Sequence, residues 1–241
     1  MSAVADAVRE LRASWTRRSS LAVLAFAVAA LAPLVFGEAR TADLADGLYL
    51  ACAAVGLAFA VGVAGLPSLA QGAFVAVGAV TGARLLAAGA PTLVAALAGG
   101  VAGGLAAGAT GVAFGRLPRA GFAAATWIVS WLAAFGVQSL QWPLGGAQGV
   151  VVSGGPSPAG HYELALALTA IAALAFLALS RSTVGLRLAG AREREAAAAN
   201  LRVPIARLRI AAKAFSGVAA RATGALAVQL AGIGDPARYG P

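Results

Sequence analysis

The side chains that could perform catalysis are few in this sequence and lie far apart. The chain has one histidine, His161, one cysteine, Cys52, and one lysine, Lys213. A nucleophile needs an adjacent base and a metal needs several ligands, so these single residues predict no catalytic or metal site. Lys213 lies in LRIAAKAF, without the glycines of the phosphate-binding pattern G-x-x-x-x-G-K-[ST]. The sequence therefore predicts neither an enzyme nor an ATPase, and it indicates no cofactor.

Charge is concentrated in one short segment, LAGAREREAAAANLRVPIARLRI (188–210). Its charged residues are Arg192, Glu193, Arg194, Glu195, Arg202, Arg207 and Arg209. The composition of 191–201 favours a helix, because alanine, arginine and glutamate have high helix propensities. Pro204 ends that helix, since the residue before a proline avoids the helical conformation. We expect a short charged helix with an alanine face near 191–201; a solvated loop with arginines extending along the membrane is the alternative.

The elements that would hold this segment are strongly apolar. Of the 241 residues, 60% are hydrophobic and 11% are charged, whereas about a quarter of the residues of a soluble domain are charged. A membrane-crossing helix needs about 20 apolar residues, so we expect an all-α polytopic membrane protein with about seven transmembrane helices. The expected segments are 19–37, 46–65, 68–89, 91–115, 120–142, 162–180 and 208–232. The first is longer than the apolar region of a signal peptide, which indicates a retained helix.

The distribution of basic residues predicts the orientation of these helices. Arginines gather in the leader 1–18, in RLPR (116–119) and in 181–207, whereas 143–160 has no charge. Loops rich in lysine and arginine stay in the cytoplasm. We therefore expect a cytoplasmic basic leader over 1–18 and a transmembrane domain over 19–241, with the segment 181–207 cytoplasmic. Membrane anchoring accounts for the net charge of +9, and no nucleic-acid partner is expected.

Glycines mark two of the apolar segments. In 91–115, Gly100, Gly104 and Gly108 recur every four residues, a spacing that lets membrane helices approach closely. GVAGLPSLAQGAF (62–74) is interrupted by glycine and proline yet carries no charge. This pattern predicts a broken helix near 62–74 whose backbone is buried in protein or lines a cavity; a tight hairpin at the membrane surface is the alternative. We expect Cys52 to be a packing residue and His161 to lie at the membrane interface.

Five local patterns then occur in one order. They are GLPSLAQGAF with VGA (65–79), RLPRAGFAAATW (116–127), PLGGAQG (143–149), SRSTVGLRLAGAREREAAAANL (180–201) and FSGVAARATGALAVQLAGIGDP (215–236). Together, over about 45–241, they resemble the permease subunits of branched-chain amino acid ABC transporters, the LivH/LivM family, and the LivM type in particular. The resemblance implies an importer of branched-chain amino acids or related small polar solutes in the cell (plasma or inner) membrane.

The resemblance also implies partners and site residues. In such permeases the charged helix is a coupling helix that docks in a groove of an ATPase subunit. The residues expected to make this contact are Arg192, Glu193, Glu195, Ala197, Ala198 and Leu201. Gly65, Ser68, Gln71 and Arg221 are the candidates for the translocation path. The expected partners are two ATP-binding subunits, a second permease subunit, an extracytoplasmic solute-binding protein and membrane lipid.

The sequence departs from the family pattern at several positions. Arg202 replaces a glycine after A-L and is expected to change how the coupling helix turns away, and Leu66 and Ala70 replace the Q and the last G of G-Q-x-S-L-G. Arg221 also replaces a glycine; because a charge at mid-membrane costs at least about 2.5–3.5 kcal/mol, Arg221 faces water or a partner, or the helix is shifted.

The chain is expected to be divergent or C-terminally short. The alternatives are a non-transporting scaffold or assembly protein and an importer of urea or short amides. A proton- or sodium-coupled carrier is disfavoured because 47–162 holds no acid.

Overall fold

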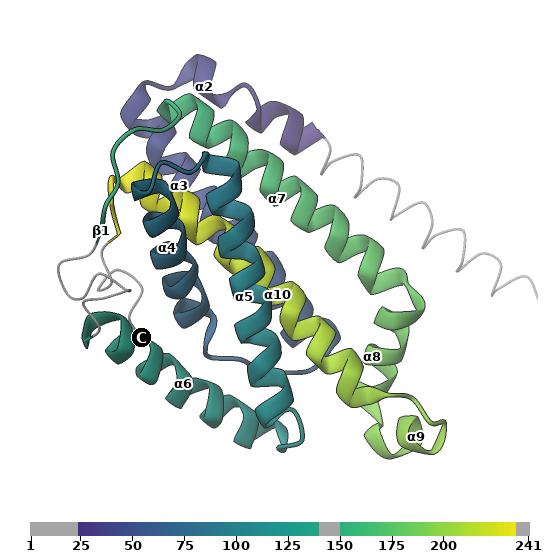
Figure 1. Cartoon of the computed structure of the whole chain (residues 1–241). Helices are drawn as coiled ribbons and strands as arrows, with labels where there is room; N and C mark the ends of the chain where they lie inside the picture. The colour runs from purple at the N-terminus through teal and green to yellow at the C-terminus, as the bar shows by residue number, and fades with distance from the viewer. Residues whose placement is uncertain (1–23, 140–149, 235–241) are drawn as a thin grey trace, which may run out of the picture.

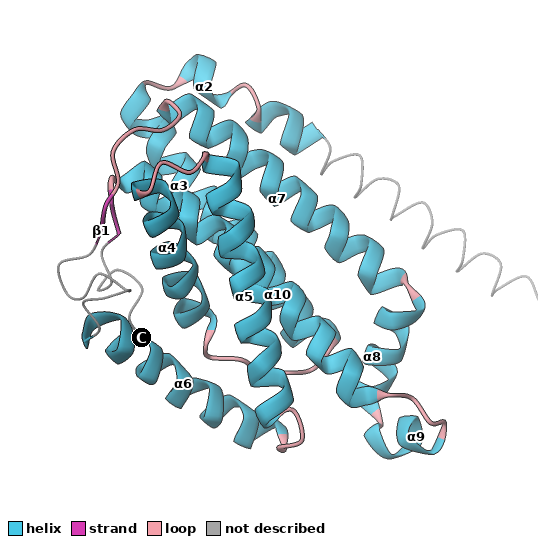
Figure 2. Cartoon of the chain, viewed as in Figure 1, coloured by secondary structure: helices cyan, strands magenta, loops and turns pink. Residues whose placement is uncertain are grey.

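The computed structural model describes residues 24–139 and 150–234, and this part of the chain is almost entirely helical (Figures 1 and 2). An apolar helical segment, Leu24–Val35, ends in α2 (Ala32–Val35). The longer helices are α3 (Glu38–Ala58), α4 (Gln71–Ala87), α5 (Thr92–Phe114), α6 (Arg119–Ser139), α7 (Pro158–Arg181) and α10 (Ile205–Ala231). The shorter elements are the π-helical turn η1 (Phe59–Val63), α8 (Thr183–Glu193), α9 (Glu195–Asn200) and the antiparallel strands β1 (Val150–Val151) and β2 (Ile233–Gly234).

Three of these helices are long and apolar enough to cross a membrane. They are Glu38–Val63, Thr92–Phe114 and Pro158–Arg181, and they agree with predicted segments. Helices α4, α6 and α10 coincide with three more, so the helical prediction is confirmed, whereas a total of seven spans stays a prediction. The leader 1–18 and the PLGGAQG pattern lie outside the described residues.

Helix α10 occupies the centre of the bundle. It packs against α5, α4 and α3, and Figure 1 shows it crossing behind α5. The contacts are close because glycines face it from all three helices. A Cβ atom built on Gly103 of α5 would lie 2.5 Å from the Gly217 carbonyl oxygen, and one on Gly78 of α4 would lie 2.5 Å from the Cβ of Arg221. On Gly56 of α3 it would lie 2.8 Å from the Cβ of Ala219. The backbones therefore approach to a distance that no larger residue allows.

Helix α5 shows how this arrangement suits a lipid environment. Its glycines Gly99 and Gly103 are buried, whereas Leu97, Val101 and Leu105 are exposed on the outside of the bundle. In a membrane the large apolar side chains face lipid, and the small residues form the contact between helices. The close packing predicted for 91–115 is confirmed.

Candidate functional site

The predicted broken helix is present. Helix α3 continues through η1 to Val63, and the chain then runs without regular structure to Gln71, where α4 begins. Gly65 has a φ of +67°, a conformation that glycine adopts without strain. The backbone of Leu69 is held by α6: its N–H donates to Thr126 Oγ1 at 3.1 Å, and its carbonyl accepts from Ser130 Oγ at 2.8 Å. Non-helical backbone at membrane depth needs such partners inside the protein.

The break ends in a polar junction between three helices. Gln71 Nε2 donates to the Ala53 carbonyl of α3 at 3.2 Å, and Gln71 Oε1 accepts from Ser216 Oγ of α10 at 3.2 Å. Ser68, three residues before Gln71, is also buried, and its Oγ has no hydrogen-bond partner among the described residues. Two of the predicted path residues, Gln71 and Ser68, therefore place polar groups in the interior of the bundle.

Two cations are buried beside this junction. Arg221 is 2% exposed; its Nη1 donates to the Ala102 carbonyl at 2.7 Å, and its guanidinium carbon lies 5.4 Å from the centre of the Phe74 ring. Lys213 Nζ lies 5.3 Å from the same ring and 5.5 Å from that of Phe122. It has no hydrogen-bond partner among the described residues. Arg221 thus lies in a contact between helices, and its partners are a backbone carbonyl and an aromatic ring.

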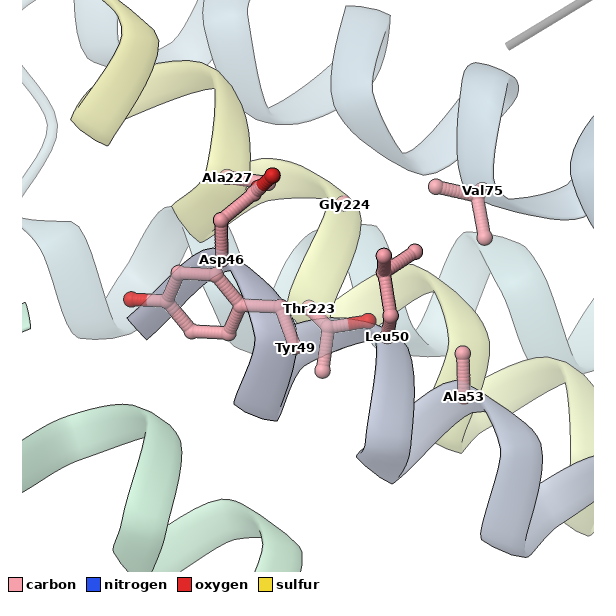
Figure 3. A pocket seen from close by; sticks show the side chains of 8 residues that line it. All are labelled: Asp46, Tyr49, Leu50, Ala53, Val75, Thr223, Gly224 and Ala227. Atoms are coloured by element: carbon pink, nitrogen blue, oxygen red, sulfur yellow. The ribbon is translucent and has the colours of Figure 1, made fainter. Parts of the chain in front are cut away.

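A cavity of about 180 Å³ lies between α3, α4 and α10 (Figure 3). Its polar lining comes from Asp46 and Tyr49 of α3 and from Thr223 of α10, and Leu50 and Val75 supply apolar walls. A cavity of roughly 150 Å³ holds a benzene molecule, so this one can hold a small solute. None of the four predicted path residues lines it, although Ala53, in its wall, accepts the hydrogen bond from Gln71.

Sequence reasoning missed Asp46 and Thr223. The signal that could have found Thr223 is a seven-residue spacing along α10, where Arg209, Ser216 and Thr223 are all buried and polar. Residues seven apart lie on one face of a helix. For Asp46, near the start of α3, the sequence carries no comparable signal.

The prediction of one helix over 191–201 is wrong. Helix α8 ends at Glu193 and α9 begins at Glu195, because Arg194 between them has an extended backbone with φ −142° and ψ 85°. Glu195 binds Arg209 of α10 through two hydrogen bonds of 3.0 and 2.9 Å. A carboxylate in the first turn of a helix is stabilised by the helix dipole. The ion pair therefore supports the start of a separate helix that is tied to α10.

The residues predicted to contact an ATPase fall into two groups. Arg192 donates to the Gly62 carbonyl in η1, its side chain covers Gly65, and its own carbonyl accepts from Arg119 of α6. Arg192 and Glu195 thus bind elements of this chain. Ala198 is buried, whereas Glu193, Ala197 and Leu201 are exposed, Leu201 to 79%. The exposed group, Glu193, Ala197 and Leu201, remains accessible to another protein.

Helix α9 ends in a Schellman motif with an arginine in place of the usual glycine. The N–H of Arg202 donates to the Ala199 carbonyl at 2.9 Å, and that of Val203 donates to the Ala198 carbonyl at 3.1 Å. Arg202 has a φ of +54°. Arg202 thus adopts a left-handed turn in which glycine is the usual residue, at a cost of about 1–2 kcal/mol. A difference in the direction of this turn from the family stays a prediction.

Comparison with known proteins identifies the family. Residues 42–241 match the family described as "Branched-chain amino acid transport system / permease component". The chain belongs to this family. No match was found among curated proteins or among solved structures. The protein is therefore a membrane permease component of an ABC-type branched-chain amino acid transporter, a class of transporter subunit and not of enzyme.

Proposed function

We propose that this permease component is part of an ATP-driven importer of branched-chain amino acids or related small polar solutes in the cell (plasma or inner) membrane. Separate ATP-binding subunits would supply the energy, and an extracytoplasmic binding protein would deliver the solute to this chain and a second permease subunit. The N-terminus would be cytoplasmic. The observation that carries the proposal is the pair of links from the α8–α9 segment to the interior of the bundle.

These links suit a coupling element. Through the ion pair between Glu195 and Arg209, a displacement of α9 acts on α10, the helix that supplies Thr223 to the cavity. Through Arg192, a displacement of α8 acts on Gly62 and Gly65 at the break. Movement at the exposed segment would therefore reach both the cavity and the polar junction at Gln71.

The exposed side chains of the segment from the end of α8 to the C-cap of α9 are the proposed contact with an ATPase subunit. They are Glu193, Ala197 and Leu201, and Leu201 is the large apolar one. A few side chains that become fully desolvated in well-packed pockets carry most of the binding energy at protein interfaces, and burial of an exposed leucine side chain contributes about 1.5–3 kcal/mol. Ala198, which is buried, would hold α9 against its own chain, as Arg192 and Glu195 do.

The proposed path uses the cavity and the junction next to it. Ser68 and Gln71 would contact the solute as it leaves the cavity, whereas Gly65 would give the break its conformational freedom. Arg221 would act by fixing α10 against α4 and α5, since glycines of both helices surround it. Bulky replacements of Ser68 or Gln71 should then block uptake while assembly persists.

The decisive test is uptake into proteoliposomes that contain the chain co-purified with its ATP-binding and second permease subunits. We expect ATP-dependent uptake of leucine, isoleucine or valine in the presence of the binding protein, and loss of ATPase association in Leu201→Asp. Asn200→Ala, a mild change on the same helix, is the matched control. Association of Leu201→Asp at the wild-type level would overturn the proposed docking surface. Uptake of urea or acetamide in place of the amino acids would identify a different solute.

A second function, that of a static scaffold, is favoured by one observation. Arg221 is enclosed by Gly78 and Gly103, a contact that restricts sliding of α10. If the assembled complex hydrolyses ATP but transports none of these solutes, the scaffold function replaces the importer function.

A further inference from the structure

A second cavity, more open to the surface than the first, lies at the end of the bundle where α7 begins and α10 ends. Its volume is about 380 Å³, and its lining includes Gly154, Pro156, His161, Gln229 and Gly232. The turn that carries Gly154 is held in place by the short β pair and by the hydrogen bond from Val152 N–H to the Gly232 carbonyl, 3.0 Å long. We call this the upper chamber and the cavity of Figure 3 the lower chamber.

The two chambers share a stretch of α10. Thr223, Gly224 and Ala227 line the lower chamber, and Gln229 and Leu230 line the upper one. The chambers therefore follow each other along one helix, within two turns of it.

Two hydrogen-bonded side chains, Tyr49 and His161, lie between the chambers. Tyr49 lines the lower chamber and His161 lines the upper one. The Tyr49 hydroxyl lies 3.0 Å from His161 Nδ1 and 3.2 Å from the His161 carbonyl oxygen. Each residue is 2% exposed. In Figure 3 the Tyr49 hydroxyl points away from Thr223, so the ring forms the wall of the chamber. His161 is thus buried in the protein, in the first turn of α7, and its position at the membrane interface stays a prediction.

Both chambers contain hydrogen-bond acceptors. The lower chamber has the Asp46 carboxylate. In the upper chamber Gln229 Oε1 is buried without a hydrogen-bond partner among the described residues, and Pro156 and Pro158 have no N–H to donate. The described lining residues of both chambers include no lysine or arginine. This chemistry suits a solute that donates hydrogen bonds.

We propose that the two cavities are successive binding chambers on one solute path, separated by the Tyr49–His161 pair, and that they accept a small solute through an ammonium or amide N–H group. The direction of movement rests on the proposed importer function, whereas the chambers and their partition do not. Passage requires Tyr49 to leave His161, which breaks the buried hydrogen bonds of the Tyr49 hydroxyl to His161 and one edge-to-face contact of the two rings, whose centres lie 6.4 Å apart.

The partition can be tested by thiol labelling, because Cys52 is the sole cysteine. In a Cys52→Ala background, Thr223→Cys reports on the lower chamber and Ala231→Cys on the upper one. A membrane-impermeant thiol reagent is applied from each side of the membrane in turn. We expect Ala231→Cys to react in every variant from one side, and from that side His161→Ala should raise the reaction rate at Thr223→Cys by about tenfold, the factor equivalent to one buried hydrogen bond.

Two further variants separate the partition from a general loosening of the fold. Tyr49→Phe keeps the ring and should give a smaller increase than His161→Ala. Tyr162→Phe loses a neighbouring hydroxyl on α7 that donates to the Ala29 carbonyl at 2.6 Å and lines neither chamber, so it should have no effect. An unchanged rate at Thr223→Cys in His161→Ala, with Ala231→Cys still reactive, would overturn the partition. An equal increase in Tyr162→Phe would overturn it too.

The solute class is tested by protection of Thr223→Cys in the His161→Ala background. Methylammonium and acetamide, at high millimolar concentration, should slow labelling, whereas acetate should not. Protection by acetate alone, or by none of the three, would overturn the proposed solute class. The assay needs neither ATP nor partner subunits, so a failure of the importer function would not change its result.

Discussion

At the scale of single residues, Arg202 has a left-handed backbone in a turn where glycine is the usual residue. The Schellman hydrogen bonds after α9 form although the residue at this position carries a side chain. The arginine therefore adopts a backbone conformation that glycine adopts at a lower steric cost.

Replacement of Arg202 by glycine should stabilise the protein. We expect Arg202→Gly to raise the free energy of unfolding by about 1 kcal/mol, because glycine adopts a positive φ without steric cost. The measurement is thermal unfolding of the purified protein in detergent. Arg202→Ala keeps a Cβ and is the matched control, with little expected change. A midpoint for Arg202→Gly that equals that of Arg202→Ala would show that the turn is not strained.

The ion pair between Glu195 and Arg209 is a second feature at this scale. The Glu195 side chain is 60% exposed, so solvent screens the pair and its contribution to stability is small, at most about 1 kcal/mol. Its geometry is nevertheless specific, since both carboxylate oxygens are bound.

Glu195→Ala should therefore uncouple the transporter more than it destabilises the fold. We expect association with the ATPase and ATP hydrolysis to persist while uptake in proteoliposomes falls severalfold. The exchanged variant, Glu195→Arg with Arg209→Glu, should recover part of the uptake. A loss of ATPase association in Glu195→Ala, with no recovery in the exchanged variant, would mean that Glu195 contacts the ATPase directly.

At the scale of elements, a helix or a break could be predicted from the sequence when the contacts that determine it lie within one segment. The glycine spacing of α5 and the uncharged break at 62–74 are properties of single segments, and both were predictable. The separation of α8 from α9 was not, because Arg194 and its neighbours are all good helix formers. The contacts that separate the two helices come from Arg209 and Gly62, which are distant in the sequence. For the same reason the cavity, built by α3, α4 and α10 together, could not be predicted from any one of them.

The close contact between α5 and α10 predicts that a larger side chain at Gly103 destabilises the protein. A Cβ on Gly103 would lie 2.3 Å from Arg221 Cδ and 2.5 Å from the Gly217 carbonyl oxygen. Because the second of these atoms is backbone, Gly103→Val must push the helices apart. We expect a loss of about 1–3 kcal/mol or more of stability, as in other overpacked cores, and a lower yield of monodisperse protein in gel filtration.

Gly62→Val is the matched control for this change. A Cβ at Gly62 meets no atom within 4 Å, so the space is open there. Equal behaviour of the two variants would show that close contact at Gly103 is not what holds α5 against α10.

At the scale of the whole molecule, α10 connects α9, the broken helix and the lower chamber. Arg209 receives the link from α9, Ser216 binds Gln71 at the break, and Thr223 lines the lower chamber. These three side chains lie on one face of a helix that α3, α4 and α5 surround. In the proposed importer, we expect the step that opens the path to the other side of the membrane to move α10 relative to at least one of these helices.

The sole cysteine offers a test of that movement between α3 and α10. Cys52 Sγ lies 3.9 Å from the Ala219 carbonyl oxygen, in a cluster where the two helices touch. Because Cys52 packs against Ala219, we expect Ala219→Cys to form a disulfide with Cys52 under mild oxidation. We expect the cross-linked transporter to hydrolyse ATP but to lose solute uptake, and a reductant should restore it. In Cys52→Ala with Ala219→Cys no disulfide can form within the chain, so oxidation should leave uptake unchanged. Full uptake by completely cross-linked protein would show that α3 and α10 move as one unit, and the movement that opens the path would then lie between α10 and the pair α4 and α5.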